Sequence, residues 1–203
     1  MKALPFISSN CYKCGIILEN QKNICDFCET DISIAKFNKF ITVFHYQKPI
    51  SKLIKDFKYK NNILNGKVLS NILKDKILSC YSKDYNFPDV IIPVPSYGRK
   101  LKFRGYNQAL EIARFLGKDL NLQVDTGFII KSKETLSQVG LDSESRLHNL
   151  SDSFEIKSHK NYNHIAIVDD IVTTSSTILA LNKIIKSNLL DVKIDIWCLA
   201  KKN

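Results

Sequence analysis

Residues 164–177 read His-Ile-Ala-Ile-Val-Asp-Asp-Ile-Val-Thr-Thr-Ser-Ser-Thr, and they carry the strongest signal of fold in the chain. The apolar run at 165–168 predicts a strand that is buried on both faces, as in a parallel sheet. Hydroxyl residues follow it, and the apolar spacing over 176–186 then predicts a helix. A buried strand that leads directly into a helix is the unit from which parallel α/β sheets are built.

The same alternation of strand and helix continues on both sides of this unit. Further short strands are predicted at 90–92, 129–130, 154–156 and 193–199. Helical spacing covers 107–120, so we expect an α/β fold with a parallel sheet from about Asp89 onward. Before it, a β-branched and aromatic run predicts a strand at 40–46, and helical patterns begin at Pro49 and cover 66–81.

Length and composition limit the class of protein. A chain of 203 residues suits one medium domain with a small appendage. With 44% hydrophobic and 25% charged residues, the composition is that of a globular protein and excludes a wholly disordered or collagen-like chain. No apolar run approaches the ~20 residues of a membrane helix, and the run from Leu4 is too short for a signal-peptide core. We therefore expect a soluble, cytoplasmic protein with no membrane span.

The charge of the chain indicates the kind of partner to expect. Its formal net charge is +10 and its pI is about 9.3. Such a basic balance favours an anionic partner, either a nucleic acid or a phosphorylated small molecule.

Four cysteines near the N-terminus form two Cys-x-x-Cys pairs, Cys11 with Cys14 and Cys25 with Cys28. Each pair can place two thiolates on one tight turn, and Gly15 allows the positive φ that such a turn often needs. Together they supply the four sulfur ligands of a structural zinc site, which leaves no open position for chemistry. Two disulfides or a redox Cys-x-x-Cys are the alternatives. We disfavour them because we expect no export signal, and because no strand and helix flank the pairs.

Asp169 and Asp170 end the predicted strand, and five hydroxyl residues open the helix after it. These five residues are Thr173, Thr174, Ser175, Ser176 and Thr177. Ligands of open α/β sheets bind at the carboxyl ends of the strands, and a helix N-terminus attracts anions. Adjacent carboxylates can accept hydrogen bonds from sugar hydroxyls, so the stretch predicts a site for a ribose 5-phosphate. An ordinary capped helix after a strand is the alternative.

This block resembles the phosphoribosyl-pyrophosphate (PRPP) motif of type I phosphoribosyltransferases. The resemblance implies that Asp169 and Asp170 hold the ribose hydroxyls, that residues 173–177 hold the 5-phosphate, and that Mg²⁺ accompanies PRPP. One position differs, because Ser175 stands where the motif usually has glycine. If the turn needs a positive φ there, serine costs roughly 1–2 kcal/mol.

Other blocks resemble the ComF/ComFC competence family. They are Lys55-Asp-Phe-Lys-Tyr59, Pro93-Val-Pro-Ser96, Arg104-Gly-Tyr-Asn-Gln-Ala109, and then Gln138, Leu141, Arg146 and Asn149 before Phe154. The N-terminal cysteine pairs belong to the same ordered set, which covers nearly the whole chain. The resemblance implies a zinc finger over 1–32, a linker and helical hood region over 33–88, and a phosphoribosyltransferase-like domain over 89–203.

The family resemblance also implies a function. The expected role is DNA uptake in natural transformation, where the protein handles incoming single-stranded DNA on the cytoplasmic side. Proteins of DNA uptake and of recombination loading are the expected partners. Transferase activity does not follow from the fold alone.

Clusters of cations supply candidate contacts for DNA or pyrophosphate. Basic residues crowd 99–104 without an acid, and others share one helix face with a tyrosine that can stack on a base. The candidates are Lys48, Lys52, Lys55, Lys58, Tyr59, Arg99, Lys100, Lys102, Arg104 and Arg146. A solvated basic loop and a core tyrosine are the alternatives, and residues 131–149 are either a hood over the ligand or an ordinary surface loop.

Three hypotheses follow. The first is a DNA-handling protein that binds single-stranded DNA and uses the PRPP-type site for a ligand or for the phosphate of the DNA. The second is a true phosphoribosyltransferase that acts on an unknown acceptor. The third is a zinc-finger interaction protein on a relic scaffold. Little sequence follows the last predicted strand to build a base-recognition pocket, so we favour the first.

Overall fold

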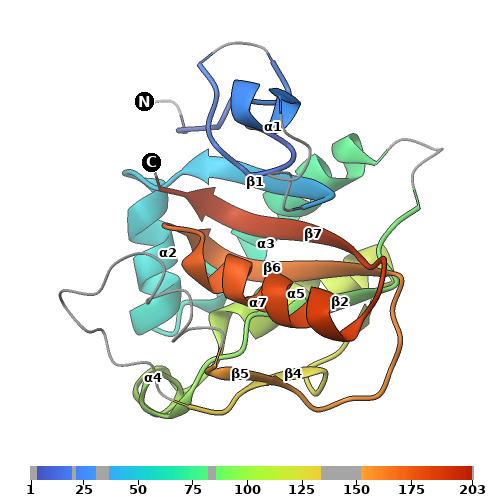
Figure 1. Ribbon diagram of the computed structural model, residues 1–203. Coiled ribbons are helices and arrows are strands. Elements are labelled where there is room, and N and C mark those ends of the chain that lie inside the picture. The colour runs from blue at the N-terminus through green and yellow to red at the C-terminus, as the bar shows by residue number, and fades with distance from the viewer. Residues whose placement is uncertain (1–3, 20–21, 31–36, 82–85, 134–151, 203) are drawn as a thin grey trace, which may run out of the picture.

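The structure is a computed structural model that describes residues 4–19, 22–30, 37–81, 86–133 and 152–202. Its centre is a five-stranded sheet in the order β1-β7-β6-β2-β3, with every neighbouring pair parallel (Figure 1). The strands are β1 (Lys39–His45), β2 (Val90–Pro93), β3 (Gln123–Val124), β6 (His164–Val172) and β7 (Lys193–Lys201). A separate antiparallel pair consists of β4 (Ile129–Lys131) and β5 (Phe154–Ile156).

Helices cover both faces of the sheet. Successive side chains of a strand point to opposite faces, and those of β6 at 165–168 are all apolar, so each face must be covered. On one face, Ile165 and Ile167 of β6 pack with α7 (Ser176–Asn188), which lies in front of the sheet in Figure 1. On the other face, Ala166 and Val168 pack with three further helices. These are α2 (Ile50–Tyr59), α3 (Ile63–Cys80) and α5 (Gln108–Leu120).

The N-terminal residues form a small finger that packs against the outer strand of the sheet. It contains the short helix α1 (Asp26–Thr30), and it lies above β1 in Figure 1. Gly15 has φ of 76°, and a Cβ there would lie 2.6 Å from the ring of Phe40. Glycine is therefore needed both for the predicted turn and for the close approach of the finger to β1.

These findings confirm the predicted α/β fold, with its parallel sheet and its N-terminal cysteine cluster. The predicted linker region supplies the edge strand β1 and the two covering helices α2 and α3. One local expectation was wrong, because β6 does not end at the aspartates but continues through them to Val172. Residues 98–104, for which a solvated basic loop was the alternative, form the short helix α4 (Gly98–Arg104). Within the described segments, no helix has the length and apolar character to cross a membrane.

Candidate sugar-phosphate site and cysteine cluster

The crevice at the carboxyl edge of the sheet exists because β2 ends before its neighbour. Pro93 pairs with Val168 in register, and β6 then runs four residues further beside β7 alone. Beyond this pair, the Val94 amide donates one more hydrogen bond, of 2.9 Å, to the Val168 carbonyl. Asp169 and Asp170 therefore lie on a part of β6 whose β2 side is open.

The two aspartates make different contacts. Asp169 Oδ1 accepts a hydrogen bond of 2.8 Å from the amide of Asp170, and Asp170 Oδ1 accepts one of 2.9 Å from the amide of Ile171. Asp170 Oδ2 lies 2.6 Å from Nζ of Lys58, at the end of α2. Burial raises the pKa of Asp169 well above its usual range, and the charge of Asp170 adds to this rise. The open edge of β6 thus carries two adjacent carboxyl groups, of which Asp170 has a lysine partner and Asp169 has a raised pKa.

The loop after β6 has backbone amides with no backbone partner in the described part of the chain. Among the residues that the structure describes, no backbone carbonyl accepts a hydrogen bond from the amides of Thr173, Thr174 or Ser175. The first bond of α7 is the one of 2.8 Å from the Leu179 amide to the Ser175 carbonyl, so the amides before Leu179 lack a partner within the helix. Such a row of amides is suited to bind an anion.

One polar pocket lies at the acid pair, but of the five predicted hydroxyl residues at 173–177 only Thr177 lines it. Its volume is about 230 Å³, and Asp169, Asp170 and Thr177 line it together with cations from three other elements. These cations are Lys58 of α2, Arg104 of α4 and Lys131 of β4. The structure therefore brings predicted residues from both ends of the chain to one place.

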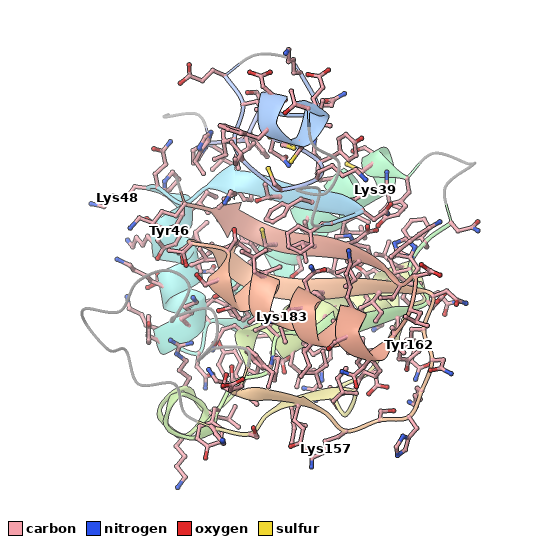
Figure 2. All side chains as sticks on the ribbon, viewed as in Figure 1. Lys39, Tyr46, Lys48, Lys157, Tyr162 and Lys183 are labelled. Atoms are coloured by element: carbon pink, nitrogen blue, oxygen red, sulfur yellow. The ribbon has the colours of Figure 1, made fainter. Side chains whose placement is uncertain are left out.

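Arg104 and Tyr59 join this pocket to the outer face of α2. Arg104 donates a hydrogen bond of 3.2 Å to the Tyr59 hydroxyl, and its guanidinium carbon lies 5.1 Å from the centre of the Tyr59 ring. Tyr59 is 55% exposed, so it is not a core residue. Lys52 and Lys55 are also exposed on α2, and Lys48 precedes that helix at the outer edge of the molecule (Figure 2).

The remaining predicted cations have separate outcomes. Lys102 is exposed on α4. Arg99 and Lys100 belong to the same helix, but the described part of the structure does not include their side chains. Arg146 lies in 134–151, outside the described residues.

Lys131 is a pocket cation that the sequence analysis did not select, and Ser96, Tyr97 and Gln108 are further lining residues that it did not select. Lys131 pairs with Phe154 across β4 and β5, and its Nζ lies 5.4 Å from the centre of the Phe154 ring. The available signal was a cation directly after the apolar pair Ile129-Ile130, but its position beside β6 depends on tertiary structure.

Asn107, which belongs to one of the blocks that resemble the competence family, caps the start of α5. Its side chain accepts a hydrogen bond of 3.1 Å from the Ala109 amide at the start of α5. Its amide group also donates one of 2.9 Å to the Val94 carbonyl, which ties α5 to the end of β2. Gly105, at the end of α4, has the positive φ of 79° that ends the helix.

The turn before α7 meets the condition under which serine, in place of the glycine of the PRPP motif, is strained. Ser175 has φ of 59°, in the left-handed region. We expect Ser175→Gly to raise the free energy of unfolding by about 0.5–1 kcal/mol, because the relief of 1–2 kcal/mol is partly offset by the freedom of glycine in the unfolded chain. Urea denaturation measures this difference.

Asn121→Gly is the matched control for that prediction. Asn121 also has a positive φ, of 54°, but asparagine tolerates this region better than serine, so the gain should be smaller. A Ser175→Gly protein that unfolds at lower urea concentration than the unsubstituted protein would contradict the strain at this turn.

The four N-terminal cysteines form the predicted cluster. All four are free, and their sulfur atoms lie within 4.8 Å of one another. Cys14 Sγ and Cys25 Sγ are 3.7 Å apart, close to the sulfur–sulfur separation of about 3.8 Å that four Zn–S bonds of about 2.3 Å produce in a tetrahedron. The donor set and its spacing thus fit a zinc ion.

The thiols of the cluster differ in how readily they ionise. Burial opposes ionisation of Cys11, but hydrogen bonds from the backbone outweigh it and lower the pKa of that thiol to about 7. Burial raises the pKa of Cys28 to about 11. A bound cation deprotonates such thiols and offsets the repulsion among four thiolates.

The cluster lies close to the loop after β6. An apolar hollow of about 270 Å³ has Cys14, Cys25 and Cys28 in its lining, and Ser175 and Leu179 also line it. The finger and the turn before α7 therefore border the same hollow.

No protein-family model matches the chain, but several curated proteins are similar over nearly its whole length. Competence protein F of Haemophilus influenzae is 29% identical over 205 residues, which cover 99% of this chain and 86% of that protein. DNA utilization protein YhgH of Escherichia coli K12 is 27% identical over 94% of this chain and 83% of that protein. The protein of the same name from Salmonella typhimurium is 26% identical over 95% and 84%, respectively. The resemblance to the ComF/ComFC competence family is thus confirmed, and the chain is a homologue of Competence protein F and of DNA utilization protein YhgH.

Proposed function

We propose that this protein acts in DNA uptake, where it handles single-stranded DNA and holds a phosphorylated ribose, such as that of PRPP, at the carboxyl end of β6. The names of its homologues, competence protein and DNA utilization protein, support the general role. The single observation that supports this ligand is the pocket that Asp169, Asp170 and Thr177 line together with three cations.

The chemistry of this pocket suits a sugar phosphate. The free amides after Val172 would bind the 5-phosphate, and carboxylate oxygens of the acid pair would accept hydrogen bonds from ribose hydroxyls. Arg104 and Lys131 would lie near a second phosphate group, such as pyrophosphate. Carboxylate oxygens are also ligands that Mg²⁺ accepts, so Mg²⁺ bound to PRPP fits this donor set.

Titration calorimetry with PRPP and Mg²⁺ tests the ligand. We expect saturable binding with one site per chain, competition by ribose 5-phosphate, and a rise in Tm through linkage. The absence of heat and of a Tm shift at millimolar PRPP would overturn this part of the proposal.

The outer face of α2 supports single-stranded DNA as the second ligand. Lys52 and Lys55 are exposed there, and the Tyr59 ring is 55% exposed, with the Arg104 guanidinium over one side of it. Charges that follow a phosphate backbone, together with a ring that stacks on a base, are the means by which proteins bind single strands.

Tyr59→Ala should weaken the binding of a labelled oligothymidylate by about 5- to 100-fold, because stacking contributes about 1–3 kcal/mol per base. Lys52→Ala should weaken it less and reduce its dependence on salt, because one fewer counterion is released. Fluorescence anisotropy at several salt concentrations measures both effects. Leu64→Ala is the control, since Leu64 is an exposed apolar residue on α3 that is 68% accessible. Equal affinities of the Tyr59→Ala and Leu64→Ala proteins would argue against this face.

Transfer of the phosphoribosyl group is the alternative use of the same pocket. It predicts release of one pyrophosphate for each PRPP consumed when an acceptor is present. A coupled pyrophosphate assay with DNA, bases and amines as acceptors separates the two functions, since binding alone consumes no PRPP.

A further inference from the structure

A second hollow lies beside the sugar-phosphate pocket, and we call it the α4–α5 hollow. Its volume is about 450 Å³, and residues of α4, α5 and β4 line it. In Figure 1, α4 and β4 lie along the lower side of the molecule. The α4–α5 hollow and the sugar-phosphate pocket share four lining residues, which are Pro95, Ser96, Asn107 and Lys131. A ligand that extends past these residues therefore reaches from one into the other.

The charges in the α4–α5 hollow are unevenly placed. Lys131 lies at its boundary with the sugar-phosphate pocket. The other charged residues of the described lining are Glu111 and Arg114 of α5, and Arg114 Nη1 lies 2.7 Å from Glu111 Oε1. Because these two charges offset each other, the part of the hollow beyond Lys131 suits an uncharged group better than a second phosphate.

The apolar side chains of this hollow are not used by the core. Leu101, Leu110 and Ile130 line the hollow, and none of them is among the described residues that make up the two large core clusters. Leu101 is 42% exposed, so a ligand that covers it removes apolar surface from water. The Ser96 and Thr126 hydroxyls add hydrogen-bonding groups to the lining. A nucleobase fits such a site, because it has flat apolar faces and a polar edge.

Arg104 connects this region with the outer face of α2. It comes three residues after Leu101 on α4, so the two side chains occupy neighbouring positions on the helix surface. Arg104 also lines the sugar-phosphate pocket and donates a hydrogen bond of 3.2 Å to the Tyr59 hydroxyl. The exposed Tyr59 ring, the cations Arg104 and Lys131, and the α4–α5 hollow are therefore adjacent in that order. A single strand of DNA presents bases and phosphates in the same alternation.

We propose that the α4–α5 hollow binds one base of the single-stranded DNA, while the phosphate next to that base lies between Arg104 and Lys131. This inference rests on the DNA part of the proposed function. It makes DNA and PRPP competitors for the two cations, because the pyrophosphate of PRPP would use the same groups. It also assigns the hollow to DNA alone, because PRPP has no base.

Leu101→Ala tests whether a base occupies the hollow. Fluorescence anisotropy should show about three- to tenfold weaker binding of a labelled oligothymidylate, because less apolar surface is covered. Leu78→Ala is the matched control, since Leu78 is a leucine of α3 that is 48% exposed and lines neither the hollow nor the sugar-phosphate pocket. Equal affinities of the Leu101→Ala and Leu78→Ala proteins overturn the inference.

An abasic oligomer of the same length separates the base from the phosphates. It keeps the charges but has nothing to place in the α4–α5 hollow, so it should bind Leu101→Ala as well as it binds the unsubstituted protein. If the substitution weakens the abasic oligomer by the same factor as the oligothymidylate, Leu101 does not contact a base, which overturns the inference.

Leu110→Ala changes the same hollow from α5, and it replaces Leu101→Ala if that substitution unfolds α4. It should weaken the oligothymidylate by a similar factor and leave PRPP binding unchanged. Saturating PRPP should displace the oligothymidylate, and simultaneous binding of both at full affinity would overturn the placement of the phosphate between the two cations. If the unsubstituted protein binds no oligothymidylate, the DNA part of the proposed function is overturned as well. If it binds but neither variant is weakened, only the inference is overturned.

Discussion

Replacement of Cys25 by serine is expected to abolish metal binding and to unfold the finger. Structural zinc contributes about 10–16 kcal/mol to the folding of small finger peptides, because a short segment has little core of its own. Cys25 is buried and lies 3.7 Å from Cys14, so a serine there removes a ligand from the centre of the cluster. Metal analysis should give one zinc per chain in the unsubstituted protein and none in Cys25→Ser.

The loss should extend beyond the finger. Unfolding of residues 4–30 would uncover the Phe40 ring, whose burial contributes about 1.5–3 kcal/mol, and the Tm of the sheet should fall by roughly 5–10 °C. Calorimetry measures this change. Cys80→Ser is the control, because Cys80 lies on α3 outside the cluster. A Cys25→Ser protein that keeps one zinc and an unchanged Tm would contradict the predicted centre.

Asp170→Asn should weaken PRPP binding by roughly 10- to 100-fold, because hydrogen bonds to charged groups contribute about 1.5–3 kcal/mol. Asparagine preserves the shape of the side chain and can still accept the hydrogen bond from the Ile171 amide. The substitution leaves the largely buried Lys58 without a charged partner, so the free energy of unfolding should fall by about 3 kcal/mol. Titration calorimetry and urea denaturation measure the two effects.

A double-mutant cycle isolates the ion pair within that result. Lys58→Met combined with Asp170→Asn should recover part of the lost stability, since no unpaired charge remains. Asp75→Asn, on the exposed surface of α3, controls for the loss of one negative charge. If the two single effects on the free energy of unfolding simply add, the contact between Lys58 and Asp170 does not stabilise the protein.

The unit of strand and helix at 164–188 could be predicted from the sequence because its signals are local. Four consecutive apolar residues specify a strand buried on both faces, and the spacing after Ser176 specifies a helix. The positive φ at Ser175 was considered only because the PRPP motif usually has glycine there, and no local pattern required it. The continuation of β6 past Asp170 was missed because acidic residues are depleted in strands. Pairing of Ile171 and Val172 with β7 provides the tertiary contact that overrides this preference.

The composition of the pocket could be predicted only in part. Asp169, Asp170 and Thr177 belong to one motif, but Lys58 and Lys131 reach it through helix packing and strand pairing far away in the sequence. Periodicity on α2 predicts which side chains face outward, and it correctly placed Lys52 and Tyr59. It cannot show that Lys58 meets a carboxylate of β6. The helix at 98–104 was missed because its dense charges conceal any apolar stripe.

The hollow shared by Cys14 and Ser175 has a consequence for how the protein responds to its surroundings. A chelator would remove the metal from the cysteines, and an oxidant would modify their sulfur atoms. Either change would disturb the finger, which borders the loop that we propose for phosphate. We expect zinc supply and thiol redox state to set how firmly the ligand is held.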